Sequence, residues 1–213
     1  MCMVPCCAAM ETVTERSRAS LTPERWIAAA TEVLVDQGID SVRVDVLSRA
    51  LKVTRGSFYW HFRDRDELLS AVLQAWRTHA TEQLTKRLES AHDDPRAQIR
   101  DLISLPFRGR AAVRAARIEL AIRAWARRDA MARAFVDEAD ASRMGYIAQV
   151  FSALGFPLVE ARSRAFLLYS YEVAESLLSS QGSAAQRAER ARFVEQLLQL
   201  PLVPSAPSGP STR

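Results

Sequence analysis

The sequence has little glycine and histidine, and the residues that usually build catalytic sites are thinly spread. None of its seven glycines belongs to a glycine-rich loop of the kind that binds nucleotide phosphates. Its three histidines, His61, His79 and His92, are scattered, and the HExxH motif of zinc peptidases is missing. We therefore expect no enzyme activity, no cofactor and no metal site.

Cysteine is missing from nearly the whole chain, because Cys2, Cys6 and Cys7 all lie at its start. Zinc sites usually combine such a cluster with further Cys or His ligands, and none follows nearby. The opening residues also lack the basic start of a signal peptide. The pattern favours a disordered cytoplasmic arm over residues 1–19, rather than a metal or redox site, with Met10 as an alternative start.

Long apolar runs are also missing, since no segment approaches the ~18–20 residues that a membrane span needs. We expect a cytoplasmic protein without membrane contact. Residues 201–213 are rich in Pro and Ser, which predicts a disordered tail. Abundant alanine, scarce glycine and the lack of any strand pattern predict an all-α fold.

Lysine is nearly absent, so the net charge of +4 comes mainly from arginine. Only Lys52 and Lys86 are lysines. Arginine suits phosphate recognition, although a general codon bias explains its abundance equally simply. The predicted domain of residues 20–66 is almost neutral: from residue 20 to residue 65 it has seven basic against six acidic residues. A basic surface there must come from the placement of charges rather than from their number.

Short helices are predicted between residues 20 and 66. The first runs from the Thr22-Pro23 start signal to Gly38, and a second covers about Val44 to Ala50. A tight turn over 51–53 leads to a third helix of about two turns that starts at Thr54. Asp64 and Glu67 then occupy capping-box positions for a fourth helix. This order predicts a helix-turn-helix.

The third helix carries the unusual stretch VTRGSFYWHF, residues 53–62. At 100° per residue, Phe58 and Phe62 face the core, whereas Gly56 and Trp60 face outward. An outer face with Trp and Gly fits close approach to DNA. Simple packing explains the aromatic residues about as well, so periodicity alone leaves both interpretations open.

The segment 21–73 resembles the DNA-binding domain of the tetracycline-repressor (TetR) family of bacterial transcriptional regulators. The specific resemblance is VTRGSFYWHF, followed by a basic residue, an acidic residue and leucine. It implies base contacts from the start of the third helix and phosphate contacts from the residues around it. The DNA-binding residues it implies are Arg43, Lys52, Thr54, Arg55, Gly56, Ser57, Tyr59, Trp60, His61 and Arg65.

Three positions depart from the family pattern. Arg43 stands where Thr or Ser is common, and it cannot cap the second helix in the same way. Lys52 replaces a frequent glycine, which implies either a strained backbone or an added phosphate contact. Arg65 stands where the family usually has a lysine that binds phosphate.

Residues 67–200 are predicted to form a second, larger helical domain. By the resemblance, it binds an effector and forms a homodimer. Large apolar and aromatic residues are the candidates for a ligand pocket: Trp76, Phe107, Trp125, Met131, Tyr146 and Phe151. The last two helices, about 158–180 and 183–199, are the candidate dimer seam. Its residues are Phe166, Leu167, Tyr169, Val173, Leu177, Phe193, Leu197 and Leu198.

These features together predict a homodimeric regulator that binds a near-palindromic site in double-stranded DNA. The first hypothesis is a repressor released by a small hydrophobic or aromatic ligand. The alternative is a regulator without a small-molecule effector, controlled by a protein partner or by its own level. An enclosed apolar cavity in the second domain would favour the first.

Overall fold

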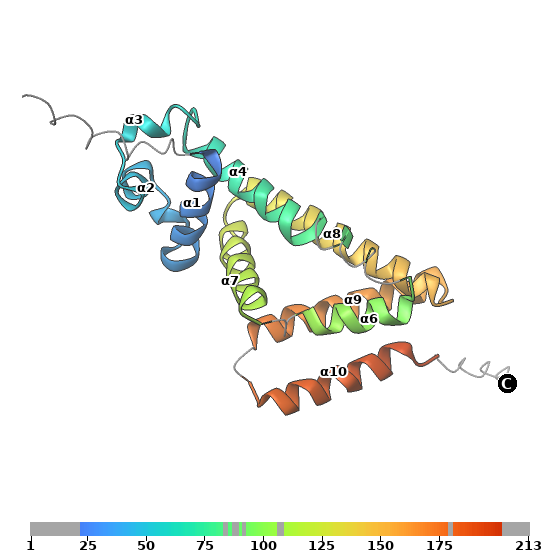
Figure 1. The fold of residues 1–213 in the computed structure, drawn as a ribbon. Coiled ribbons are helices and arrows are strands. Elements are labelled where there is room, and N and C mark those ends of the chain that lie inside the picture. Colours follow the sequence, from blue (N-terminus) through green and yellow to red (C-terminus); the bar gives the residue numbers. More distant parts are fainter. Residues whose placement is uncertain are drawn as a thin grey trace, which may run out of the picture. The chain divides into compact units, whose positions relative to one another are not determined.

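The structure is a computed structural model that describes residues 22–82, 85, 86, 90, 93–105, 109–178 and 181–201. Within these residues every regular element is a helix and no strand occurs, which confirms the predicted all-α class (Figure 1). Contacts divide the chain into two compact units, with the boundary between Val72 and Leu73. No helix in the described part of the chain is both long and apolar enough to cross a membrane.

The first unit contains four short helices and the start of a longer one. They are α1 (Pro23–Gln37), the 3₁₀ helix η1 (Ile39–Ser41), α2 (Val44–Leu51), α3 (Arg55–Phe58) and the beginning of α4 (Arg65–Arg77). Pro23 occupies the first turn of α1, where its missing N–H costs nothing. Gly38 ends α1 with a φ of 82°, and its N–H donates to the carbonyl of Leu34.

The core of this unit is built around two fully buried aromatic rings. Trp26 of α1 meets Phe58 of α3 edge to face, with ring centroids 5.3 Å apart. Phe62 stacks on Phe58 at 5.6 Å and is also buried. The predicted inward direction of these two phenylalanines is therefore confirmed.

Local signals place the start of α4. The Oδ1 of Asp64 accepts a hydrogen bond from the N–H of Glu67 at 2.9 Å. The Glu67 carboxylate accepts one in return from the N–H of Arg63 at 2.6 Å. This reciprocal arrangement is a capping box shifted by one residue, because the returned bond goes to the residue before Asp64.

The second unit contains the remaining helices (Figure 1). They are the π-helical turn η2 (Thr78–Glu82), α6 (Pro95–Ser104), α7 (Gly109–Ala126), α8 (Ala130–Ala153), α9 (Leu158–Leu177) and α10 (Ala184–Gln199). Asp94, Asp129 and Ser183 cap α6, α8 and α10 through side-chain hydrogen bonds.

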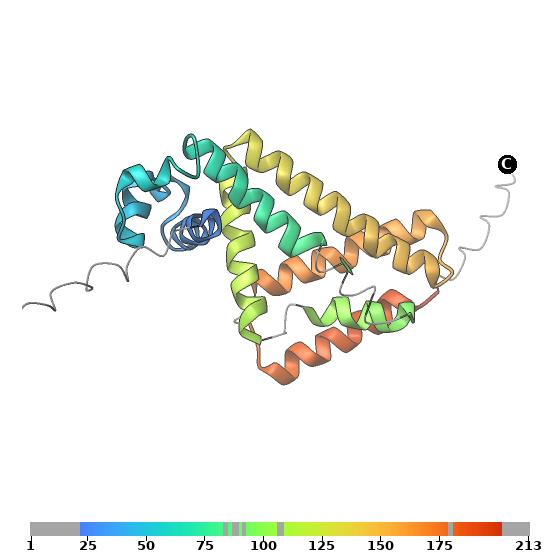
Figure 2. The same cartoon turned by 45° about the horizontal axis from the view of Figure 1, so that its top comes forward.

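Helix α8 packs along α9, while α7 lies against α8, and α6 lies beside α10 (Figure 2). A continuous apolar core joins α6, α8, α9 and α10, with Phe151 and Leu168 completely buried in it. The guanidinium of Arg164 on α9 fastens the end of α10 by donating to the carbonyls of Leu198 and Leu200. The long helices of this unit are therefore held by both apolar packing and buried polar contacts.

Two local features differ from the sequence prediction. Helix α3 is a single turn over Arg55–Phe58 instead of two turns, and residues 59–61 continue it as a turn. The N–H groups of His61 and Phe62 still donate to the carbonyl of Phe58, which closes this turn. The π-helical η2 after α4 was not predicted, because periodicity does not distinguish one π-helical turn from an α-helix.

Candidate functional site

The turn that follows α3 presents two large aromatic side chains to solvent. Trp60 is 87% exposed and Tyr59 is 63% exposed, although the Tyr59 ring still touches buried Phe58 edge to face. His61 is partly buried. Exposing so much aromatic surface in one place is unfavourable unless a partner covers it. This face is therefore a candidate binding surface.

Gly56 adds an open space to the same face. A Cβ placed at Gly56 would meet only the Oγ1 of Thr54, at an ordinary contact distance of 3.8 Å. The backbone of Gly56 is helical and does not need glycine. Since neither space nor backbone geometry explains this glycine, close approach of an external surface explains it better.

The remaining predicted DNA-binding residues surround this face without forming a compact basic cluster. Lys52, Thr54 and Arg55 are exposed, and Ser57 is partly buried. Arg43, at the start of α2, is exposed and lies 3.6 Å from the carboxylate of Asp45. Lys52 adopts a left-handed backbone with φ 57° and ψ 43°, so the strained turn expected there is present.

Arg65 has a structural role that the sequence did not predict. Its Nε donates to the carbonyl of Val42 at 2.6 Å, and its Nη2 donates to that of Ile39 at 2.9 Å. Both bonds cross from the first turn of α4 to the connection between α1 and α2. The guanidinium of Arg65 therefore fixes this connection, and only its remaining N–H groups can bind a phosphate.

A cluster of charged side chains lies inside the second unit, between α7, α8 and α9. Arg123 donates to Asp140 at 2.6 and 3.0 Å and to Glu119 at 2.8 and 3.1 Å. Arg143 donates to both oxygens of Glu119, at 2.9 and 3.0 Å. The hydroxyl of Tyr169 accepts from both arginines and donates to Asp140. We call these five residues the Arg-Tyr network.

The network shifts the ionisation of its members in ways that follow from burial and pairing. Burial alone would raise the pKa of Asp140, but hydrogen bonds from Arg123 and Tyr169 hold that pKa below its usual value. Burial raises the pKa of the Tyr169 hydroxyl. Asp140 is thus held as a carboxylate against Arg123.

One further carboxyl group lies beside this network, with an oxygen that lacks a partner. Burial raises the pKa of Glu172 on α9 to about 8; the charge of Arg143 opposes this shift and that of Glu119 adds to it. The Oε1 of Glu172 is shielded from solvent and has no hydrogen-bond partner within the described part of the chain. Trp76 also packs against Arg143, whose guanidinium carbon lies 5.5 Å from the ring centroid.

The residues predicted for a ligand pocket lie at different depths in the described part of the second unit. Trp76, Trp125 and Phe151 are buried, while Met131 and Tyr146 are partly buried. Phe151 packs in the core with Phe156. Phe107 lies outside the described residues. Of the predicted set, Trp76 reaches the Arg-Tyr network, through its contact with Arg143.

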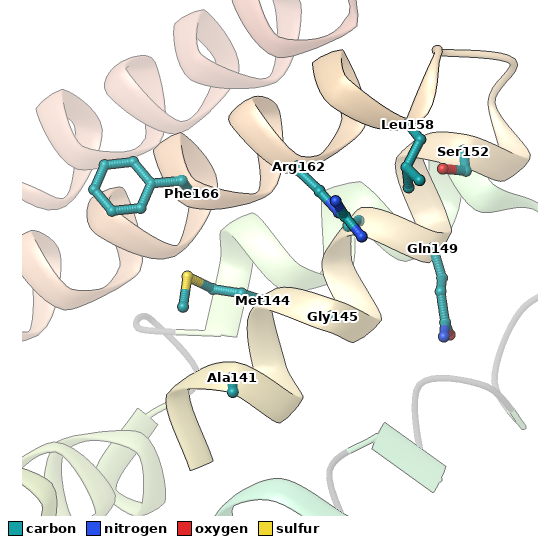
Figure 3. Close-up of a pocket in the computed structure, with 9 residues that line it drawn as sticks. Ala141, Met144, Gly145, Gln149, Ser152, Leu158, Arg162 and Phe166 are labelled. Carbon is teal, nitrogen blue, oxygen red and sulfur yellow. The ribbon is translucent and has the colours of Figure 1, made fainter. Parts of the chain in front are cut away.

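A separate groove lies on the outer surface of α8 and α9 (Figure 3). Met144 and several small or polar residues of α8 line it, and Leu158, Arg162 and Phe166 of α9 border it. None of the predicted pocket residues lines this groove. It is open to solvent and differs from the enclosed apolar cavity that the first hypothesis called for.

The predicted dimer residues divide into an outward and an inward set. Of the predicted residues on α9 and α10, the exposed ones are Phe166, Leu167, Leu177, Phe193 and Leu197, and Leu200 after α10 is exposed as well. Val173 is partly buried against the core and Leu198 is buried. Tyr169 also differs from the prediction: it turns into its own unit, because its hydroxyl is bound by the Arg-Tyr network.

Sequence reasoning missed the network because ion pairs between distant helices leave no local motif. A signal for Glu172 does exist in the sequence. Ala161, Ala165, Leu168 and Glu172 recur at spacings of four, three and four, so Glu172 lies on the same stripe of α9 as three buried residues and is itself partly buried. A carboxylate in such a stripe is uncommon and marks a site that needs a partner.

Comparison with known proteins gives matches to the first unit. Residues 27–72 match the family model described as bacterial regulatory proteins, tetR family. The HTH-type transcriptional regulator SrpR of Pseudomonas putida is 46% identical over 66 residues, which are 31% of this chain and 30% of that protein. TtgW, another Pseudomonas putida protein named as an HTH-type transcriptional regulator, is 46% identical over 66 residues, 31% of this chain and 48% of that protein. The match thus spans less than half of these relatives, which are named regulators and not enzymes.

Solved structures match over most of the chain. A transcriptional regulator from Rhodococcus sp. Rha1 has a TM-score of 0.66 at 21% identity, covering 84% of this chain and 94% of that one. A regulator from Saccharomonospora viridis, solved in complex with choline, has a TM-score of 0.65 at 17% identity, covering 83% and 92%. At these identities the similarity establishes a shared fold.

Proposed function

Because this chain belongs to the tetR family of bacterial regulatory proteins through its first unit, we propose that it is a sequence-specific transcriptional regulator, and specifically a repressor that a small molecule releases from DNA. The observation that carries the proposal is the exposed pair Tyr59 and Trp60 beside the open backbone of Gly56. These residues lie inside the segment that matches the family.

Each exposed group has a role that its chemistry suits. Arg55 can donate two hydrogen bonds to the edge of a guanine in the major groove. Trp60 offers an apolar plate to a thymine methyl or a sugar. The hydroxyl and imidazole groups of Tyr59 and His61 can donate to phosphate oxygens. The other proposed phosphate contacts come from Arg43, Lys52, Thr54 and Ser57.

We also propose that the protein forms a homodimer through α9 and α10. Phe166, Leu177, Phe193 and Leu197 are exposed on these helices, and a four-helix seam with a second copy would bury them. Two first units would then enter successive major grooves of a near-palindromic site, ~34–36 Å apart. The proposed place of action is the cytoplasm, where bacterial DNA lies.

Release by a ligand requires that the ligand bind one state of the dimer better than the other. Helix α4 runs from the first unit into the second, since it spans the boundary between Val72 and Leu73. A ligand that shifts α4 would change the spacing of the two DNA-binding units. The choline found in a regulator of the same fold supports a small-molecule effector for the second unit.

The proposal is tested by fluorescence anisotropy of the full chain with labelled DNA from upstream of its own gene, at fixed salt and with competitor DNA. We expect saturable nanomolar binding that the Tyr59→Phe/His61→Ala and Arg55→Ala variants lose. Arg133→Ala removes the same charge from an exposed site on α8 and should bind like the wild type. Equal losses in Arg55→Ala and Arg133→Ala, or binding that salt alone abolishes, would contradict sequence-specific recognition.

A further inference from the structure

The second unit contains a partly buried acid, Glu172, whose Oε1 is shielded from solvent and unpaired within the described part of the chain. Glu172 follows Ala161, Ala165 and Leu168 on the stripe of α9 that faces the core. An apolar residue at this position would pack without the cost of removing a carboxyl group from water. The position therefore suggests that Glu172 serves something other than the packing of α9.

The neighbouring charges are balanced without it. Within the Arg-Tyr network, the positive charges of Arg123 and Arg143 are matched by Glu119 and Asp140. Both arginines also use N–H groups to bind Tyr169. An ionised Glu172 would be the fifth charge and would leave the site with a net charge of −1.

A second polar group at the same site is also unpaired. Trp76 is only 7% exposed, and its indole N–H has no hydrogen-bond acceptor among the residues described. The ring lies against Arg143, the same arginine whose charge acts on Glu172. An unused acceptor and an unused donor thus lie around one guanidinium. Buried polar groups are nearly always hydrogen-bonded in native proteins, so the pair points to a missing partner.

We propose that this partner is a small organic cation, an amine or amidine, whose N–H group donates to the carboxylate of Glu172. The indole N–H of Trp76 then donates to an acceptor elsewhere on the ligand, or to a water bound to the ligand. A monocation supplies the one positive charge that the site lacks when Glu172 is ionised. The assignment rests on the proposed function, because it names the chemical class of the effector. It also narrows the expected hydrophobic or aromatic ligand to one with a positive charge.

Cation binding at this site releases a proton. The groups that face Glu172 with a charge are Arg143 from α8 and Glu119 from α7, with Arg123, Asp140 and Tyr169 behind them. Because the pKa of Glu172 is raised to about 8, the free protein holds its proton at neutral pH. A cation favours the carboxylate, so its affinity rises about tenfold per pH unit below this pKa and levels off above it.

Isothermal titration calorimetry of the full chain tests this with matched probes. Benzamidine and 2-phenylethylamine are the cations, benzamide and 2-phenylethanol are their neutral counterparts, and benzoate is the anion. We expect the cations alone to bind saturably, with about one proton released per cation when titrations in buffers of different ionisation enthalpy are compared. Glu172→Gln should weaken binding by roughly 30-fold or more.

Two further variants keep the result interpretable. Asp137→Asn removes a carboxylate from an exposed site on α8 and should leave cation affinity unchanged. Glu172→Leu places an apolar residue on the core stripe, so it should fold normally and still lose cation binding. Equal binding of neutral and cationic probes, no binding by any cation, or unchanged affinity in Glu172→Gln would each overturn the assignment.

The same preparations distinguish this inference from the proposed function. Anisotropy with operator DNA measures DNA binding independently of any probe. If the protein binds DNA but no cation, the effector class is wrong and the regulator remains. If the protein binds cations but not DNA, the regulator is wrong and the cation site remains.

Discussion

The Nε of Arg65 lies 2.6 Å from the carbonyl oxygen of Val42 and donates a hydrogen bond to it. With the second bond to Ile39, this residue ties the connection between α1 and α2 to the start of α4. The sequence resemblance predicted a phosphate contact from Arg65. In this chain, its two hydrogen bonds indicate that the main role of Arg65 is to position the parts of the DNA-binding unit.

Replacing Arg65 with lysine tests this positioning role. A lysine has a single ammonium group and cannot hold both carbonyls in the same fork geometry. We expect Arg65→Lys to lower the free energy of unfolding by about 1–2 kcal/mol, with a parallel loss of DNA affinity, measured by urea denaturation and anisotropy. If Arg65→Lys were as stable as the wild type and bound DNA equally well, Arg65 would instead be a simple phosphate contact.

A substitution at Gly56 separates an effect on close DNA approach from an effect on folding stability. A methyl group at Gly56 has room within the protein, and alanine favours helix, so Gly56→Ala should be as stable as the wild type or slightly more so. We expect its DNA affinity to fall by about tenfold or more, since the new Cβ keeps DNA at a distance. Gly145→Ala in α8 is the matched control, because its Cβ also meets nothing and it lies in the second unit. Equal DNA affinity in both variants would show that no surface approaches Gly56 closely.

The left-handed backbone at Lys52 predicts a stabilising substitution. Non-glycine residues at such φ values cost about 1–2 kcal/mol, whereas glycine adopts them freely. Lys52→Gly should raise the free energy of unfolding by about 1 kcal/mol, after the greater entropy of the unfolded glycine chain is subtracted. Lys52→Ala keeps the strain and should not be more stable. Anisotropy on both variants reports whether the lost ammonium group also weakens DNA binding.

The raised pKa of Glu172 predicts how the free energy of unfolding depends on pH. Below the ordinary pKa of a glutamate, near 4.5, both folded and unfolded chains hold the proton. As pH rises from there to about 8, the unfolded chain loses this proton first, so stability falls by up to about 1.4 kcal/mol per pH unit. Above this range the loss is complete.

Urea denaturation from pH 5 to 9 of wild type and Glu172→Gln isolates this contribution by difference. We expect the variant to gain stability over the wild type as pH rises to about 8, and the difference to level off above that pH. Parallel stability curves for the two proteins would mean that Glu172 ionises normally in the fold.

The exposed apolar faces of α9 and α10 predict the oligomeric state. Phe193→Glu places a charge in the centre of the proposed seam and should convert a dimer into a monomer, as measured by sedimentation velocity. Val113→Glu makes the same change at an exposed apolar residue of α7 and should remain dimeric. A wild-type protein that sediments as a monomer at micromolar concentration would contradict the seam.

Local signals in the sequence determined most of the secondary structure. Pro23 and Gly38 bound α1, Asp64 caps α4, and Ser183 caps α10 through interactions only a few residues apart. Such short-range effects can be followed along the chain without knowing the fold. The same holds for Phe58 and Phe62, which helical spacing placed in the core.

Tertiary structure decided what depends on residues far apart in the chain. Arg65 reaches carbonyls more than twenty residues away, and Tyr169 turns inward because Asp140 and two arginines on other helices bind it. A helical pattern shows that Glu172 faces the core, but not which charges surround it. Amphipathic periodicity specifies the direction of a side chain, whereas its partners, and therefore its ionisation and its role, are set by the packing of the helices.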